Sequence, residues 1–247
     1  MKPVPGAAAR GPSIWTRPER SARGPSPEHS RAEIASAGVT LADASGLGAV
    51  TMRSVAAAIG TAPASLYRYV ATRDELVELM ADQVYGEYSY QLATGEPVAD
   101  LLRLASEGIA MYRRHPWLLD VTTAGTLPGP NALAFVEHTL AALAPTNLTG
   151  PVKLETVGLF SGAVRLFAQT ELDQQRAGQN TAQWQESLAR YLAGVAASGQ
   201  NPHLTAALID QPSDATAAQH EQLFARAMKR IVTGLLPPPP PDHSTTR

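Results

Sequence analysis

Three arginines and two tyrosines lie in a stretch of the chain that carries no acidic residue. The stretch runs from Ala44 to Arg73, in a chain whose formal net charge is −2. Guanidinium groups bind phosphates and base edges, and tyrosine hydroxyls donate hydrogen bonds to phosphate oxygens. A compact DNA-binding protein needs only a local basic face, so the stretch predicts a nucleic-acid surface despite the overall charge. The residues are Arg53, Tyr67, Arg68, Tyr69 and Arg73.

Patterns for catalysis or metal binding are missing from the sequence. The six histidines are scattered, no pair has the spacing of a zinc helix, and there is no Walker A loop or Gly-x-Ser-x-Gly elbow. Gly46-Leu47-Gly48 lacks the third glycine of a dinucleotide loop, and helix capping explains the acid pair Asp74-Glu75. We therefore expect no metal, no cofactor and no enzyme activity, with a helical enzyme as a remote alternative.

Two short helices joined by a tight turn are predicted for residues 51–70. Thr51 is a good N-cap for the first helix, and Gly60 ends it. Pro63 suits the first turn of the second helix, where its missing N–H costs nothing. In a helix-turn-helix of this kind, one helix enters the major groove of DNA while the other crosses the backbone.

The second of these helices, Pro63–Val70, is predicted to read DNA. Leu66 and Val70 are four residues apart and face the core, which leaves the other faces free. Small residues at its start allow close approach to the groove. Taken singly, the tyrosines suit packing and the arginines suit solvent, and Arg73 could also pair with an adjacent acid. The predicted DNA-facing residues are Arg53, Pro63, Ala64, Ser65, Tyr67, Arg68, Tyr69 and Arg73.

Amphipathic helices are predicted on both sides of this unit. In Glu28–Ala44, apolar or small residues recur at i, i+3, i+4 and i+7 from Ile34. Gly38 stands in the middle of that helix, at a propensity cost of roughly 1 kcal/mol. The helix that follows the unit begins with Thr72 and Glu75, the spacing of a capping box.

The rest of the chain also has helical periodicity, broken by proline and glycine clusters. No segment shows the alternation of a β-strand, so the predicted fold is all-α, with a small DNA-binding domain and a larger helical domain. Helices are expected near Val98–Arg114, Trp117–Thr123, Asn131–Leu143, Val152–Arg176, Thr181–Ala197, Leu204–Ile209 and Thr216–Leu235.

Two of these helices, 152–176 and 216–235, are candidates for a subunit interface. The first is apolar on more than one face, and Gly158 and Gly162 would let another helix approach closely. The second carries one clear apolar stripe. Packing within one chain is the alternative explanation for both.

A ligand pocket in the larger domain is suggested by aromatic residues and a few polar groups. Arg165 lies in a strongly apolar helix and needs a partner, which Glu155 or Glu171 could equally supply. Each aromatic side chain alone is also explained as plain core. The candidate pocket residues are Tyr112, Trp117, Phe135, His138, Phe160, Arg165, Phe167 and Trp184, with Tyr191 as a further aromatic.

Composition suggests four segments along the chain. Residues 1–26 and 237–247 are expected to be disordered tails, 27–90 the DNA-binding domain and 91–236 the larger domain. The first tail is basic, which fits either an arm that contacts DNA or a solvated end. The sequence has no cysteine and no apolar run long enough for a membrane span, which favours a cytoplasmic protein.

The stretch from roughly Ser30 to Glu87 closely resembles the DNA-binding domain of TetR-type transcriptional regulators. The resemblance implies an all-helical homodimer that represses transcription from a palindromic operator until a small molecule binds the larger domain. A helical ligand-binding or protein-interaction module without sequence-specific DNA binding is the alternative. The matching residues are Thr51-x-Arg53-x-Val55-Ala56, Ile59-Gly60, Pro63-Ala64-Ser65-Leu66-Tyr67-Arg68-Tyr69-Val70 and Arg73-x-Glu75-Leu76.

The resemblance also implies roles for single residues. Tyr67 stands where the family commonly places a tyrosine on a backbone phosphate, and Arg53 where a basic residue reaches a base edge or phosphate. Tyr69 stands where the family often has histidine, and Arg73 where it often has a lysine near a phosphate. Ala62 replaces the usual small polar cap, so Thr61 is expected to take over that role.

Overall fold

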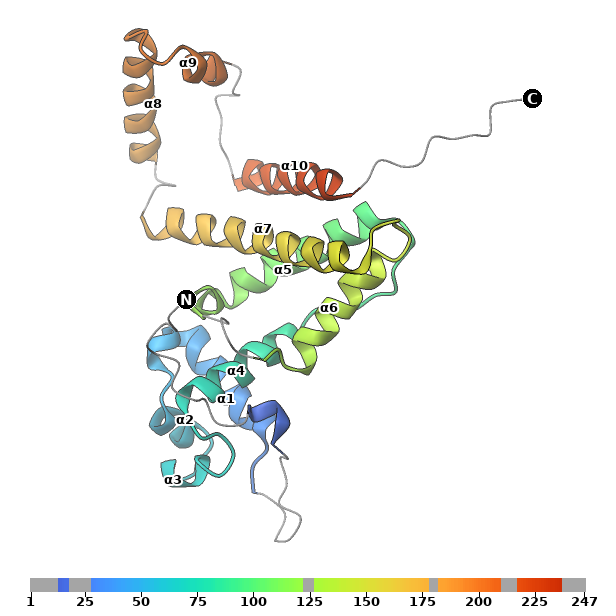
Figure 1. The fold of residues 1–247 in the computed structure, drawn as a ribbon. Coiled ribbons are helices and arrows are strands. Elements are labelled where there is room, and N and C mark those ends of the chain that lie inside the picture. The colour runs from blue at the N-terminus through green and yellow to red at the C-terminus, as the bar shows by residue number, and fades with distance from the viewer. Residues whose placement is uncertain (1–12, 18–27, 122–126, 178–181, 210–216, 237–247) are drawn as a thin grey trace, which may run out of the picture.

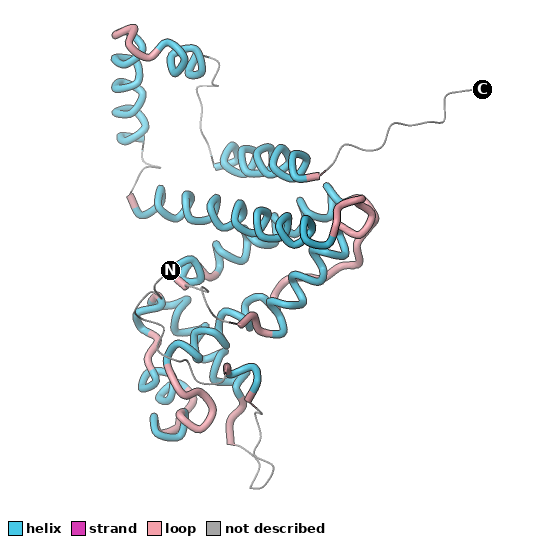
Figure 2. The backbone as a smooth tube through the Cα atoms, viewed as in Figure 1, coloured by secondary structure: helices cyan, strands magenta, loops and turns pink. Residues whose placement is uncertain are grey.

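All regular secondary structure in the described part of the chain is helical (Figures 1 and 2), which confirms the predicted all-α class. The computed structural model describes residues 13–17, 28–121, 127–177, 182–209 and 217–236. Within these residues, no helix is both long and apolar enough to cross a membrane. The α-helices are α1 Arg31–Ser45, α2 Met52–Ala58, α3 Pro63–Leu66, α4 Arg73–Tyr85, α5 Pro97–Arg114, α6 Pro130–Ala142, α7 Gly150–Arg176, α8 Ala182–Ala197, α9 Pro202–Ile209 and α10 Ala217–Leu235; the 3₁₀ helices are η1 Ile14–Thr16, η2 Leu47–Ala49 and η3 Pro116–Asp120.

The predicted caps begin α2 and α4. The Thr51 side chain accepts a hydrogen bond from the backbone N–H of Ser54, at 3.0 Å. The Thr72 side chain accepts from the backbone N–H of Glu75, at 3.1 Å. The Glu75 carboxylate accepts from the backbone N–H of Ala71 at 2.7 Å, so it fastens the turn that enters α4.

The reading helix α3 is shorter than predicted. It ends at Leu66, and the chain continues to Tyr69 as a turn, closed by hydrogen bonds from the backbone N–H groups of Tyr69 and Val70 to the Leu66 carbonyl. The prediction of one helix through Val70 is therefore wrong in its second half. Ala62 is the N-cap and supplies no side-chain hydrogen bond, so the expected cap at Thr61 is not what begins this helix.

A close crossing of α1 and α4 holds the small domain together. A methyl group added at Gly38 would lie 2.6 Å from the Met80 sulfur, which is closer than van der Waals contact allows. Met80 is fully buried, so it has little room to move. The glycine that costs helix propensity therefore permits this approach.

Residues 13–17 are not part of a disordered tail, and the expectation for them is wrong. They form η1, and the Ile14 side chain is fully buried in the core. The Arg31 guanidinium donates to the carbonyls of Ile14 and Arg17, both at 3.0 Å. The Arg17 guanidinium also pairs with Glu75, and Trp15 packs against the core, so several contacts with the small domain fix this short segment. Residues 1–12 and 18–26 of the predicted tail lie outside the described residues, as do 237–247.

The larger domain is a layered bundle in which α5 packs against α6, α7 and α10. Figure 1 shows α4 leading from the small domain toward this bundle, where it packs on α6. Helices α8 and α9 pack on each other and project away from the body of the chain (Figure 1). The predicted helix Trp117–Thr123 is instead the 3₁₀ turn η3, which ends at Asp120.

Candidate DNA-binding surface and effector cavity

The end of α3 separates a core face from an outer face, as predicted. Leu66 and Val70 are fully buried, whereas Tyr67 is 56% exposed and Arg68 is exposed beside it. Arg53 is exposed on α2. The two apolar anchors fix the backbone, so the tyrosine hydroxyl and the guanidinium groups are presented to solvent.

The start of α3 offers a slim, polar-poor surface. Pro63 and Ala64 are exposed and Ser65 is half-buried. Their short side chains leave the backbone accessible, which suits close approach to a groove floor or to thymine methyl groups. No acidic residue interrupts the stretch from Ala44 to Arg73.

Tyr69 does not share this surface. Its side chain is 8% exposed, and its hydroxyl accepts a hydrogen bond from the backbone N–H of His29 at 3.4 Å. Its carbonyl accepts from the Arg31 guanidinium at 3.3 Å. Because the chain leaves α3 as a turn after Leu66, this side chain is rotated inward, contrary to the expectation from sequence.

Arg73 is exposed, but its guanidinium is already engaged. It donates to the carbonyls of Val50 and Leu47, each at 2.7 Å. These bonds tie the start of α4 to the segment that precedes α2. The expected alternative, an ion pair with Asp74 or Glu75, is not formed.

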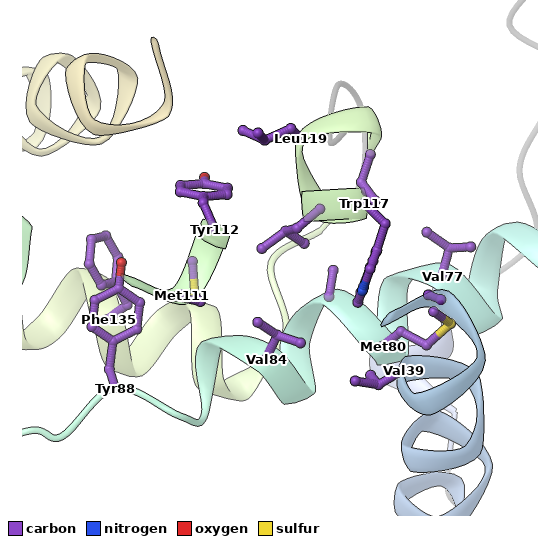
Figure 3. Close-up of a cluster of buried hydrophobic side chains, with 14 of the residues drawn as sticks. Val39, Val77, Met80, Val84, Tyr88, Met111, Tyr112, Trp117, Leu119 and Phe135 are labelled. Carbon is purple, nitrogen blue, oxygen red and sulfur yellow. The ribbon is translucent and has the colours of Figure 1, made fainter. Parts of the chain in front are cut away.

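An aromatic cluster fills the middle of the larger domain (Figure 3). Figure 3 shows Phe135 lying beside Tyr88, and their ring centroids are 4.9 Å apart. Tyr85 stacks on Tyr88 at 6.2 Å and tilts against Phe135 at 5.8 Å. Tyr112 is buried on α5 nearby, and burial raises the pKa of Tyr85 and Tyr88 above the ordinary range. The sequence prediction named Phe135 and Tyr112 but missed the tyrosines that follow or end α4.

His138 and Tyr90 close one end of this cluster. Their rings stack with centroids 4.0 Å apart. The Tyr90 hydroxyl donates to the carbonyls of Tyr85 and Asn131, at 2.9 and 3.2 Å. Burial raises the pKa of Tyr90 to about 12, so it stays a hydrogen-bond donor at physiological pH.

Arg165 finds its partners in the backbone. Its guanidinium donates to the carbonyls of Leu118, Leu119 and Val121 at the end of η3. Of the two acids proposed as its partner, Glu171 pairs with Arg113 instead. Arg165 therefore ties α7 to η3.

The remaining predicted pocket residues are spread over the domain. Trp117 and Phe160 are almost fully buried. Phe167 packs edge-on against Phe224 of α10, with centroids 5.4 Å apart. Trp184 lies on the projecting helix α8 and is 37% exposed. Trp184 therefore lies apart from the aromatic cluster.

A cavity of about 280 Å³ lies between η1, α4 and the start of α6. Its lining is mostly apolar, with two carboxylates. None of the eight predicted residues lines it, although Tyr85 connects its wall to Phe135. Its lining residues are Trp15, Glu78, Ala81, Asp82, Tyr85, Val121, Leu127, Pro128, Gly129 and Ala132.

Asp82 organises one wall of this cavity from α4. Its carboxylate accepts from the backbone N–H groups of Asn131 and Ala132, at 3.3 and 2.9 Å, so it caps the start of α6. Burial raises the pKa of Asp82 even though both backbone hydrogen bonds favour its charged form. A methyl group at Gly129 would lie 2.3 Å from its Oδ1. Only a glycine leaves room for this cap.

We expect Gly129→Ala to lower the free energy of unfolding by about 1–3 kcal/mol, because the new methyl group displaces the Asp82 carboxylate. Urea unfolding followed by circular dichroism measures the change. Gly194→Ala on α8 is the control, because a methyl group there meets nothing within 4 Å and the residue lies outside the helices proposed for the subunit interface. Equal stability of the Gly129→Ala variant and the wild type would contradict the cap.

Comparisons with known proteins agree with the two-part organisation. Residues 34–80 match the family model described as bacterial regulatory proteins, tetR family, and residues 91–237 match the tetracyclin repressor-like C-terminal domain. The HTH-type transcriptional repressor DrrR1 of Streptomyces coeruleorubidus is 35% identical over 228 residues, covering 90% of this chain and 83% of the relative.

Solved structures show the same arrangement. Apo ActR from Streptomyces coelicolor is 25% identical, with a TM-score of 0.67 over 83% of this chain and 96% of ActR. The complex of ActR with (S)-DNPA, also 25% identical, gives a TM-score of 0.66 with the same coverage. The chain therefore belongs to the TetR family of bacterial transcriptional regulators.

Proposed function

We propose that this protein is a dimeric repressor that binds a palindromic operator and is released from it by a small molecule. The relative DrrR1 is named as a repressor, and most of its length aligns with this chain. This likeness supports repression and not activation. We infer that the protein acts through binding and not through catalysis, as regulators of this family do.

The observation that carries the proposal is the exposure of Tyr67 directly after the fully buried Leu66. The buried anchor fixes the backbone at Tyr67, which supports a role for its exposed hydroxyl as a donor to a backbone phosphate. Arg53 and Arg68 supply charge on the same small domain, and Pro63 to Ser65 approach the bases. Tyr69 is left out of the proposed contact set because it is buried.

The twofold axis of the dimer would place two small DNA-binding domains, one from each subunit, on successive major grooves of the operator. We propose that α7 and α10 form the subunit interface. On α7 the face around Gly158 and Gly162 is open, and Leu159 is 60% exposed. An exposed apolar face beside small residues accommodates a second helix at close range.

For the effector we propose the larger domain and its junction with α4. The structural relative ActR binds (S)-DNPA. In this chain the cavity beside Asp82, together with the aromatic cluster behind Tyr85, offers an apolar surface with few polar groups, which suits a small aromatic or apolar ligand. Phe135, Tyr112 and His138 remain candidates for its deeper wall.

A titration of the protein against DNA from its own promoter region tests the proposal. Measured at two salt concentrations with excess random competitor, wild-type binding is expected to survive the competitor with two protomers per site. Tyr67→Phe is expected to weaken binding by about three- to tenfold, through loss of one phosphate hydrogen bond. Arg53→Ala is expected to weaken it by about tenfold or more and to flatten the salt dependence.

The matched control is Arg190→Ala, which removes an exposed arginine on α8, far along the chain from α3. It should bind the operator as the wild type does. If Tyr67→Phe and Arg53→Ala also bind as the wild type does, the docking surface is wrongly assigned. Binding that disappears with competitor would favour the alternative, a ligand-binding module without sequence-specific DNA binding.

A further inference from the structure

A polar cluster joins the two domains where α1 meets the larger domain. His115, which is 6% exposed and follows α5, lies between two carboxylates. Its Nδ1 is 2.7 Å from Oδ1 of Asp43, in the last turn of α1, and its Nε2 is 3.1 Å from both carboxylate oxygens of Glu87, just after α4. The Trp117 indole N–H donates to the same Asp43 oxygen at 2.7 Å.

The two contacts of the His115 ring make specific demands on its two nitrogens. An ionised carboxylate only accepts hydrogen bonds, so both nitrogens of His115 must donate to make both contacts. A neutral imidazole carries one N–H, so one side would then place two acceptors opposite each other. Both contacts can be hydrogen bonds at the same time only when the ring carries two N–H groups.

With His115 protonated, the ring and Arg114 together balance the carboxylates of Asp43 and Glu87, and the nearby Glu107 pairs with Arg103. Arg114 on α5 donates to Glu87 at 2.8 Å, and Glu107 on α5 lines the same small cavity as Glu87 and Arg114. Burial raises the pKa of Glu87, but hydrogen bonds from Arg114 and His115 outweigh it, so the pKa lies below its ordinary value. The last turn of α1 contains no basic residue, so the positive ring also interacts favourably with that helix end.

The cluster is continuous with the core of the larger domain. Trp117 belongs to η3, and Arg165 of α7 holds the carbonyls at the end of η3. Figure 3 shows the Trp117 ring pointing from η3 toward α4 and α1. A series of direct contacts therefore connects α7, through η3 and His115, to α1 of the small DNA-binding domain.

We propose that Asp43, Glu87 and His115 form a proton-dependent latch. The latch fixes the small DNA-binding domain against the larger domain, so that loss of the His115 proton lowers operator affinity. The inference rests on the proposed operator binding. A dimer must hold two DNA-binding domains at the spacing of the operator, and in this proposal the latched arrangement is the one with that spacing. An unlatched head must be ordered on binding, which costs affinity.

The test measures operator affinity between pH 6 and 8.5 at constant ionic strength, for the wild type, His115→Gln and Asp43→Asn. Wild-type affinity is expected to fall by about fivefold or more as the pH rises, the lower end of usual coupling strengths. His115→Gln should bind weakly at every pH and lose this dependence, and Asp43→Asn should flatten it. Nitrogen NMR of the His115 ring, assigned by its absence in His115→Gln, should titrate together with the affinity.

Two other histidines serve as controls. His138→Gln changes a histidine of the larger domain that contacts Tyr90, and His29→Gln changes one beside Glu33 near the reading head. Both variants should keep the pH dependence of the wild type. The latch is overturned if His115→Gln keeps that dependence, if His29→Gln removes it, or if the ring titrates while the affinity does not follow.

Failure of the proposed function gives a different result. In that case none of the proteins shows sequence-specific binding to the operator at any pH. The rate of amide hydrogen exchange in α1, measured for both proteins at the same pH, then tests the latch. Exchange should be faster in His115→Gln than in the wild type at pH 6, and equal exchange would overturn the latch.

Discussion

Replacing Leu159 and Leu166 with lysine is expected to separate the dimer and to lower operator affinity by about three orders of magnitude. The two side chains are 60% and 66% exposed on α7, beside the open face at Gly158 and Gly162. Burying a lysine charge without a partner is strongly unfavourable, so the two helices from different subunits cannot pack. A monomer then binds one half-site and loses the gain from two linked heads, about 10²- to 10⁴-fold.

Sedimentation velocity measures the oligomeric state, and the operator titration measures the affinity. The matched control is Leu133→Lys, which places the same charge at an exposed leucine on α6. This control should remain dimeric and bind the operator normally. A Leu159→Lys, Leu166→Lys protein that is still a dimer would show that α7 is not the interface.

The second large effect is expected for Trp117→Ala, which should lower the free energy of unfolding by about 3–5 kcal/mol. The indole is 2% exposed where η3 meets α4 and α1 (Figure 3), so its removal leaves a cavity at the junction of the domains. Trp117→Phe keeps most of the ring but loses the donor to Asp43. It should cost about 1–2 kcal/mol.

Urea unfolding followed by circular dichroism measures both changes. Trp184→Ala is the control, because that tryptophan is 37% exposed on α8 and its loss should cost less than about 1 kcal/mol. Equal losses for Trp117→Ala and Trp184→Ala would mean that the junction is not as closely packed as the structure indicates.

Local signals in the sequence identified most of the helices and part of the outer face of the small DNA-binding domain, but not the early end of α3 or the burial of Tyr69. The sequence identified Thr51 and Thr72 as N-caps because a cap is a hydrogen bond between residues three apart in the chain. Leu66 and Val70 separate core from surface because a helix places residues four apart on the same face. This periodicity alone also identified the exposed position of Tyr67.

Contacts between distant residues were beyond the reach of such patterns. Ile14 and Trp15 are one short apolar pair in a segment without periodicity, so nothing local distinguishes them from a tail. By local criteria Gly38 is only a weak helix former. Its role, to leave room for Met80, depends on the packing of α4 against α1. Arg165 found backbone carbonyls, which every residue carries and no sequence pattern marks.

The effector region shows the same division most clearly. The sequence determined that the larger domain is helical and rich in aromatic residues, because composition and periodicity are local properties. It did not determine which aromatic side chains meet, because that depends on how helices cross, and the cavity formed instead beside Trp15 and Asp82. The pairing of His115 with Asp43, 72 residues earlier in the chain, likewise exists only once η3 has packed against α1.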